Sequence, residues 1–320
     1  MKKPVKIALE MAALGGVTAA GAYGLCSLID ELLFNRNMVL PESVGRKISG
    51  CDDSHLGAFL QDNLKWLEDY GYEKHYLISD SGYKLTGYLL KAKEESDLYL
   101  FGAHGYRSYG KKEFCGVAQY YISKGINVFI PDHVASGESE GTYCTFGYNE
   151  VRDCMKWLSY MKDNFGKDIR IILHGVSMGC ATVTMMSGRE DLPENVVGVV
   201  ADCGFTTAKA LFRYKLGDLG VPPEKLINAV DAVHTRKMGF SFDDLKPVES
   251  VKNSKVPMLF IHGAEDKLVP CSMVKELYEA CGSEYKDLLV VEDADHAQSF
   301  KVNREQFEAK LDNMLKMIKM

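Results

Sequence analysis

The sequence lacks a clustered cysteine motif, a block of positive charge and an internal repeat. Its nine cysteines are dispersed, odd in number and never spaced as Cys-x-x-Cys, which argues against a zinc site and against a disulfide framework. Lysine and arginine total 38 against 44 aspartates and glutamates, a net charge of -6, which argues against a nucleic-acid partner. No low-complexity linker divides the 320 residues. This length fits one domain of about 250 to 280 residues with an appendage.

The N-terminal 30 residues differ in character from the rest. Lys2, Lys3 and Lys6 precede an uncharged stretch from Met11 to Ile29, which approaches the length of a helix that crosses a bilayer. We expect residues 1–30 to form a membrane anchor or signal segment, with the N-terminus inside and the rest of the chain outside the cytoplasm. A cleaved signal peptide, giving a secreted protein, and an amphipathic helix packed on a soluble, cytoplasmic protein are the alternatives. Residues 31–71 are predicted to be a helical lead-in.

From residue 72 to residue 320, apolar segments of strand length alternate with helical patterns. This alternation predicts an α/β fold with a mostly parallel sheet and helices on both faces. The predicted strands are 72–78, 83–91, 98–103, 126–130, 169–173, 196–201, 257–261 and 286–291, and the predicted helices are 54–70, 113–124, 148–164, 273–281 and 304–319.

The alternation is interrupted between about residues 205 and 255, where helical patterns replace core strands. We expect this insertion to form a short helical cap over the strand ends. Its side chains Phe205, Phe212 and Phe240 would then shape a substrate pocket. The alternative is a helical satellite that only packs on the domain.

The motif Gly175-Val176-Ser177-Met178-Gly179 lies between a predicted strand and a predicted helix. Glycines at both ends suit a sharp turn, because a Cβ there would collide with the neighbouring strand or helix. Such a turn exposes the Ser177 hydroxyl as a nucleophile. It also directs the Met178 amide and the start of the helix at negative charge on a bound carbonyl oxygen.

A serine nucleophile needs a base, and the base needs an orienting carboxylate. The loop after strand 257–261 carries Asp266, with Glu265 as its neighbouring rival, and the loop after strand 286–291 carries His296. The order serine, aspartate, histidine at successive strand ends is the order that brings the three together in an open α/β sheet. We therefore predict Ser177, Asp266 and His296 as a catalytic triad.

A second amide donor is expected after strand 98–103, where His104-Gly105-Tyr106 follows. Gly105 permits a tight turn that would direct the Tyr106 amide into the same site as the Met178 amide, forming an oxyanion hole. His104 and His174 are predicted to be structural. Asp132 and the glycine-rich loop after it are expected to border the pocket.

Together these motifs resemble those of the α/β-hydrolases, specifically the serine aminopeptidase S33 or monoacylglycerol-lipase-like branch. The resemblance covers about Tyr72 to the C-terminus. It rests on His104-Gly105-Tyr106, Asp132 with Gly137-x-Ser139-x-Gly141, the Ser177 motif, His262-Gly263-x-x-Asp266-x-x-Val269-Pro270 and Asp295-His296-Ala297. It implies the same triad and oxyanion hole. One departure is Val134-Ala135, where the family usually has Arg-Gly, and the absence of His-Gly-Gly-Gly argues against the hormone-sensitive-lipase branch.

These residues predict a serine hydrolase that cleaves a carboxylic ester through an acyl-enzyme, without a cofactor or metal. The expected partner is a small-molecule ester or acyl compound, with no nucleic acid and with membrane association through residues 11–29. An aminopeptidase or amidase, or a thioesterase or acyltransferase, would use the same triad. A catalytically silent, membrane-anchored binding protein is the alternative from another class.

Overall fold

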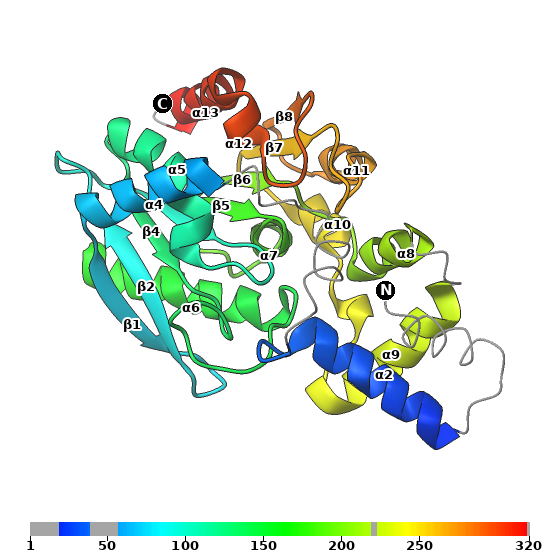
Figure 1. Cartoon of the computed structure of the whole chain (residues 1–320). Coiled ribbons are helices and arrows are strands. Elements are labelled where there is room, and N and C mark those ends of the chain that lie inside the picture. Colours follow the sequence, from blue (N-terminus) through cyan, green and yellow to red (C-terminus); the bar gives the residue numbers. More distant parts are fainter. Residues whose placement is uncertain (1–18, 39–56, 219–222, 319–320) are drawn as a thin grey trace.

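The computed structural model describes residues 19–38, 57–218 and 223–318, and its centre is an eight-stranded sheet (Figure 1). The strand order is β1-β2-β4-β3-β5-β6-β7-β8. Strand β2 is antiparallel to both of its neighbours, and the six strands from β4 to β8 run parallel, which confirms the predicted fold class. The strands are β1 Glu73–Ile78, β2 Lys84–Leu90, β3 Leu98–Ala103, β4 Asn127–Pro131, β5 Arg170–Val176, β6 Val196–Asp202, β7 Met258–Gly263 and β8 Lys286–Val291.

Helices cover both faces of this sheet and enclose two apolar cores. Helices α5 (Gly110–Ser123) and α13 (Arg304–Ile318) pack on one face. Helices α6 (Tyr148–Phe165), α7 (Met178–Ser187) and α11 (Ser272–Ala280) pack on the other. The strands are buried on both sides, so they are apolar runs rather than alternating ones. The shorter helices are α10 Pro247–Ser250 and α12 Ser299–Val302, with 3-10 turns η2 Phe242–Asp244 and η3 Val251–Asn253.

The lead-in segment before β1 and the insertion between β6 and β7 both form helices. Helix α4 (Gly57–Tyr70) packs against α5 and buries Leu67 in the first core, whereas residues 54–56 of the predicted lead-in helix lie outside the described residues. Between β6 and β7 the chain forms α8 (Ala208–Asp218) and α9 (Pro223–Met238) in place of core strands. These two helices contribute to a third apolar cluster that is separate from both sheet cores.

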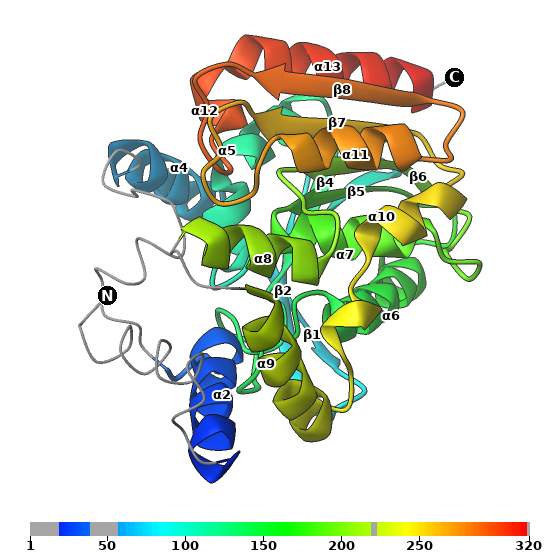
Figure 2. The same ribbon diagram turned by 90° about the vertical axis from the view of Figure 1, so that its right-hand side faces the viewer.

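Helix α2 (Ala19–Phe34) is the third contributor to this cluster, and both views place it beside α9 (Figures 1 and 2). Its residues Cys26, Asp30 and Phe34 are buried. Because residues four apart share one face of a helix, these three form a single buried stripe. The Asp30 carboxylate accepts hydrogen bonds from His234 Nδ1 at 2.5 Å and from Lys237 Nζ at 3.0 Å, both on α9.

The predicted membrane segment overlaps α2. Residues 11–18 lie outside the described residues, and the remainder of the segment forms the first part of this helix. No helix in the described part of the chain is both long enough and apolar enough to cross a membrane. The predicted single-pass span is therefore unsupported there.

Candidate active site

The Ser177 turn connects β5 directly to α7 and has the strained geometry that its glycines predict. Ser177 has φ +56° and ψ -115°, in the left-handed range that non-glycine residues seldom adopt. A Cβ on Gly175 would collide with the carbonyl of Gly179, and a Cβ on Gly179 would collide with the carbonyl of Ala103. The Ser177 amide donates to the Asp202 carbonyl on β6 at 2.9 Å. Strand pairing thus fixes the turn that exposes the hydroxyl.

The structure brings Ser177, His296 and Asp266 into one hydrogen-bonded chain. Ser177 Oγ lies 2.8 Å from His296 Nε2, and His296 Nδ1 lies 2.7 Å from Asp266 Oδ2. The other carboxylate oxygen of Asp266 accepts the backbone amides of Leu268 and Val269, each at 2.8 Å. The distances suit a serine that donates to a neutral imidazole, which in turn donates to a carboxylate.

The rival acid Glu265 takes no part in this chain. Its side chain is exposed, and its backbone amide donates to the Ala294 carbonyl at 3.0 Å. Asp266 is buried, and its Oδ2 also lies 3.1 Å from His262 Nε2, which donates to the Val269 carbonyl at 2.9 Å. The geometry therefore selects Asp266 from the two adjacent acids.

Asp266 and His296 shift each other's pKa. Burial alone would raise the pKa of the Asp266 carboxyl, but the charge of His296 and hydrogen bonds from His262 and His296 hold that pKa below its usual value. Burial alone would lower the pKa of His296, but the charge and hydrogen bond of Asp266 raise that pKa above its usual value. The pair therefore favours an ionised carboxylate that stabilises an imidazolium.

One predicted oxyanion donor, Met178, directly follows Ser177, and the loop that carries the other, Tyr106, approaches the Ser177 turn. A Cβ built on Gly105 would be 3.4 Å from Ser177 Cβ, so the loop after β3 lies against the nucleophile turn. Within the described residues, neither the Tyr106 amide nor the Met178 amide donates to a protein acceptor. Amides without a protein acceptor can bind a negatively charged oxygen. Their role as an oxyanion hole stays a prediction.

The two histidines that were predicted to be structural are buried and hydrogen-bonded within the fold. His104 Nδ1 donates to the Gly105 carbonyl at 2.8 Å, and its Nε2 accepts the His133 amide at 2.9 Å. His174 Nδ1 lies 3.1 Å from the Tyr121 hydroxyl, and burial lowers the pKa of His174 to about 3. Neither histidine takes part in the hydrogen bonds that connect Ser177, His296 and Asp266.

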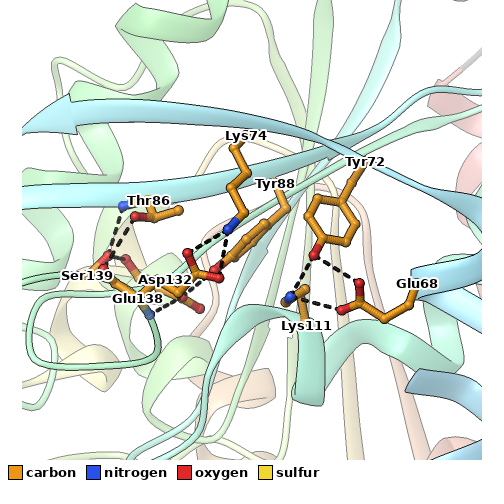
Figure 3. Close-up of polar contacts among 9 residues, drawn as sticks. All are labelled: Glu68, Tyr72, Lys74, Thr86, Tyr88, Lys111, Asp132, Glu138 and Ser139. Atoms are coloured by element: carbon orange, nitrogen blue, oxygen red, sulfur yellow. Dashed lines mark hydrogen bonds and ion pairs between the residues drawn. The ribbon is translucent and has the colours of Figure 1, made fainter. Parts of the chain in front are cut away.

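Asp132 organises the glycine-rich loop after β4 (Figure 3), and the position of this loop at the border of the pocket stays a prediction. Its buried carboxylate accepts the Tyr88 hydroxyl at 2.9 Å and the amides of Gly110 and Glu138, each at 2.8 Å. The Ser139 hydroxyl donates to the Asp132 carbonyl at 2.7 Å. The acceptor capacity of the carboxylate is thus used by protein donors, which joins the loop to β2 and to the start of α5.

The Val134-Ala135 departure lies within this loop. Both residues are buried, and Ala135 has φ +59° while its amide donates to the Glu140 carbonyl at 2.8 Å. Alanine here occupies a left-handed backbone position where the resembled family has glycine, at a cost of about 1–2 kcal/mol. The loop keeps a turn at this point despite the substitution.

The predicted pocket residues Phe205, Phe212 and Phe240 all belong to the third apolar cluster, but they have different neighbours within it. Phe212 lies 5.5 Å from Phe146 between ring centroids and Phe205 lies 6.3 Å from it, and the Phe146 ring is 4.8 Å from that of Tyr106. Phe240 instead stacks on Tyr148 at 4.1 Å. Phe205 and Phe212 thus lie near the Tyr106 loop through Phe146, whereas Phe240 packs between Tyr148 of α6 and His234 of α9.

Sequence reasoning missed Phe146 and Phe34, which meet at 5.5 Å beside the same loop. Phe34 comes from α2, more than a hundred residues away in the chain. No motif marks either phenylalanine. Phe146 contacts the Tyr106 ring directly, whereas Phe34 is brought there by the packing of α2 on α9.

Three groups around His296 were also missed as parts of the site. The Asp202 carboxyl at the end of β6 is buried, and burial raises its pKa to about 7, although the charge of His296 opposes the shift. Glu113 Oε2 accepts the Gly105 amide at 3.2 Å, and the Cys203 thiol lies 4.0 Å from His296 Nε2. Asp202 ends a parallel strand between those of Ser177 and Asp266, a position that could have indicated it.

Known proteins with similar sequences are mostly of undetermined function. The chain is 29% identical over 199 residues to the uncharacterized protein YqkD of Bacillus subtilis, covering 61% of this chain and 65% of YqkD, less than two thirds of that relative. It is 23% identical over 222 residues to the uncharacterized membrane protein YNL320W of Saccharomyces cerevisiae, covering 68% and 70%. It is also 23% identical over 205 residues to the putative esterase YitV of Bacillus subtilis, covering 58% and 74%.

Solved structures share the fold. The esterase Pf2001 of Pyrococcus furiosus superposes with a TM-score of 0.63 at 25% identity, covering 80% of this chain and 94% of the esterase. Mouse alpha/beta hydrolase domain-containing protein 10 superposes with a TM-score of 0.60 at 18% identity, covering 77% and 99%. Both neighbours support the α/β-hydrolase fold.

The profile of the prolyl oligopeptidase family matches residues 112–320, a range that contains Ser177, Asp266 and His296. This family is not the serine aminopeptidase S33 or monoacylglycerol-lipase-like branch that the motifs resemble, and the superfamily is the level on which the two agree. The chain therefore belongs to the prolyl oligopeptidase family, within the α/β-hydrolase superfamily of serine hydrolases.

Proposed function

We propose that this protein hydrolyses carboxylic esters through an acyl-enzyme on Ser177. The observation that carries the proposal is the hydrogen-bonded chain from Ser177 through His296 to Asp266. Ser177 Oγ attacks the ester carbonyl carbon while its proton passes to His296 Nε2. The amides of Tyr106 and Met178 hold the negative oxygen of the tetrahedral intermediate. His296 then returns the proton to the departing alcohol oxygen, and a water repeats the sequence to release the acid.

The surroundings of the site support an apolar acyl group. Phe146, Phe205 and Phe212 lie next to the oxyanion loop, and we propose that residues 205–255 cover the site as a cap. An aminopeptidase needs an acid for the substrate amine, but Glu138 pairs with Lys74 at 2.7 Å and Glu140 accepts the Lys84 amide at 2.9 Å. Both acids are therefore engaged at the surface.

An aminopeptidase or amidase is the second candidate, and two observations favour it. The family is named for a peptidase, and the half-buried carboxylate of Glu113 lies beside the oxyanion loop. A substrate ammonium group would gain a charge-assisted hydrogen bond there. The two candidates share every step except the leaving group, so only a comparison of substrates separates them.

The test measures hydrolysis of p-nitrophenyl esters from acetate to palmitate and of aminoacyl p-nitroanilides by the full-length protein. The full chain is needed because α2 contributes to the third apolar cluster. We expect ester hydrolysis to exceed anilide hydrolysis in kcat/KM. Ser177→Ala should lower kcat by about 10⁴- to 10⁶-fold, since the triad acts as one unit.

Ser187→Ala is the matched control, because Ser187 lies at the far end of α7 and donates to the Thr184 carbonyl at 2.8 Å. It should keep the wild-type rate. Faster cleavage of the anilides would replace the esterase proposal by the aminopeptidase one. No hydrolysis of either series, together with no labelling of Ser177 by a fluorophosphonate, would rule out a serine hydrolase mechanism.

A further inference from the structure

The loop that carries the Tyr106 amide has a strained backbone. Arg107, the next residue, has φ +54°, in the left-handed region that costs a non-glycine residue about 1–2 kcal/mol. Gly105 on the other side lies against Ser177, so a small rotation of the loop would move the Tyr106 amide away from the nucleophile. Contacts from elsewhere in the fold must therefore hold this conformation.

Those contacts come from the carboxyl end of α2. The Arg107 guanidinium donates through Nη2 to the Leu32 carbonyl at 2.8 Å and the Asn35 carbonyl at 3.3 Å, and through Nη1 to the Met38 carbonyl at 3.0 Å. Its Nε donates to the Tyr106 hydroxyl at 2.8 Å. The Tyr106 hydroxyl itself donates to the Leu33 carbonyl.

The chemistry of this contact favours arginine over lysine. The last carbonyls of a helix lack partners within the helix and carry its partial negative charge, which favours a cation there. A guanidinium can reach several carbonyls at once with a fixed planar fork, whereas a lysine ammonium is a single point of attachment. Because these donors are already used, Arg107 is not a free cation for a substrate carboxylate.

Helix α2 is a firm support because its other contacts fix it to the fold. Buried Asp30 is bonded to His234 and Lys237 of α9. The Phe34 carbonyl accepts the Cys144 amide at 2.9 Å, next to the aromatic cluster. The support thus connects the cap helices to the loop of the oxyanion donor.

We propose that Arg107 is a positioning residue for the oxyanion hole, which clamps the Tyr106 loop to helix α2 and so holds the Tyr106 amide toward Ser177. This inference rests on the proposed function, because it assigns the support of a donor in that mechanism. It also gives α2 a role in the active site, although α2 precedes the part of the chain that matches the family profile.

A matched control exists at the same end of α2. Arg36 donates to the Ser139 carbonyl at 2.8 Å and the Gly137 carbonyl at 3.3 Å, so it also secures the chain after α2 but touches a different loop. If the arginines merely attach the helix, Arg107→Ala and Arg36→Ala should have similar effects. If Arg107 positions the amide, only the first should slow the chemical step.

The experiment measures kcat and KM of Arg107→Ala, Arg107→Lys and Arg36→Ala on the best p-nitrophenyl ester, with inhibition by a trifluoromethyl ketone that mimics the tetrahedral intermediate. Loss of an oxyanion donor typically costs about 100- to 1000-fold, and a displaced donor somewhat less. We expect Arg107→Ala to lower kcat by about 30- to 100-fold with KM nearly unchanged, and to weaken the inhibitor in parallel. Arg107→Lys should recover only part of kcat, and Arg36→Ala should stay within about twofold.

The inference is wrong if Arg107→Ala keeps its kcat, if Arg36→Ala costs the same factor, or if the change lies in KM alone. Tyr106→Phe, which removes only the hydroxyl contact with Leu33 and Arg107, should lower kcat in the same direction and replaces Arg107→Ala if that variant does not fold. A wild type that hydrolyses no ester refutes the proposed substrate class. The role of Arg107 is then tested by the rate at which a fluorophosphonate labels Ser177, a reaction that needs no particular ester. A slower labelling rate in Arg107→Ala than in Arg36→Ala supports the proposal, and equal rates contradict it.

Discussion

The substitution Asp266→Asn tests the triad with the smallest change in shape. Both carboxylate oxygens of Asp266 act as acceptors: Oδ2 lies 2.7 Å from His296 Nδ1 and 3.1 Å from His262 Nε2, and Oδ1 accepts two backbone amides. An asparagine has only one acceptor oxygen. If that oxygen keeps the backbone amides of Leu268 and Val269, the side-chain NH₂ must face the two imidazoles.

The consequence for His296 can be worked out from these contacts. An NH₂ group facing Nδ1 favours the tautomer with its proton on Nε2, and this tautomer cannot accept the proton of Ser177. The substitution also removes the charge that stabilises the imidazolium. We expect kcat/KM to fall by about 10³- to 10⁴-fold, equivalent to about 4–5.5 kcal/mol in the activation free energy. The residual activity should titrate at lower pH, because burial lowers the pKa of His296 once the charge of Asp266 is gone.

The assay is the pH dependence of ester hydrolysis from about pH 5 to about pH 10, with Glu265→Gln as the matched control. Glu265 is the adjacent acid and is exposed, so its variant should keep the wild-type profile. If Asp266→Asn retains more than about a tenth of kcat/KM, Asp266 is not the orienting carboxylate. An equal loss of activity in the two variants would contradict the assignment as well.

Three further predictions concern His296, Phe212 and Lys111. In the wild type, kcat/KM should rise with pH through a pKa above the usual histidine value of about 6.5, because His296 must be neutral to act as a base and Asp266 raises its pKa; a midpoint below that value would contradict the assignment. Phe212→Ala should shift ester preference toward longer acyl chains, since it removes a ring 5.5 Å from Phe146, and an unchanged chain-length profile would place the acyl site elsewhere. Lys111→Met should lower the free energy of unfolding in urea by about 1–2 kcal/mol. The Lys111 ammonium bonds Glu68 at 2.9 Å and lies 4.9 Å from the Tyr88 ring centroid (Figure 3). A urea midpoint equal to that of the wild type would show that these contacts contribute nothing to stability.

The alternation of apolar runs was enough to predict the fold, because parallel strands buried on both faces need such runs. Strand β3 and strand β8 have the predicted bounds, Leu98–Ala103 and Lys286–Val291. Strand β5 runs past its predicted end at Leu173 to Val176, since Gly175 and Val176 pair with β6. Such pairing depends on a neighbour outside the local sequence, so local pattern places a strand better than its ends.

The Ser177, Asp266 and His296 side chains were predictable for a related reason. Each follows a parallel strand, and the carboxyl ends of parallel strands share one edge of the sheet, so order in the chain translates into proximity. The same rule would have indicated Asp202. It could not separate Phe240 from Phe212, because the insertion has no strand to fix the direction of its helices.

The N-terminal segment shows where composition alone fails to decide. An uncharged apolar stretch predicts burial, but segments buried against lipid and segments buried against protein have similar compositions. The distinguishing signal is the stripe Cys26, Asp30 and Phe34, in which a carboxylate lies between two apolar residues on one face. A buried carboxylate needs a partner, and here the partner is His234 of the inserted helices. That contact fixes the direction of α2, and its direction brings the free carbonyls at its end to Arg107. The support of the oxyanion loop therefore depends on the pairing of Asp30 with His234, some two hundred positions apart in the chain. Arg107 binds backbone carbonyls, which every residue type has, so no local motif could have indicated this support.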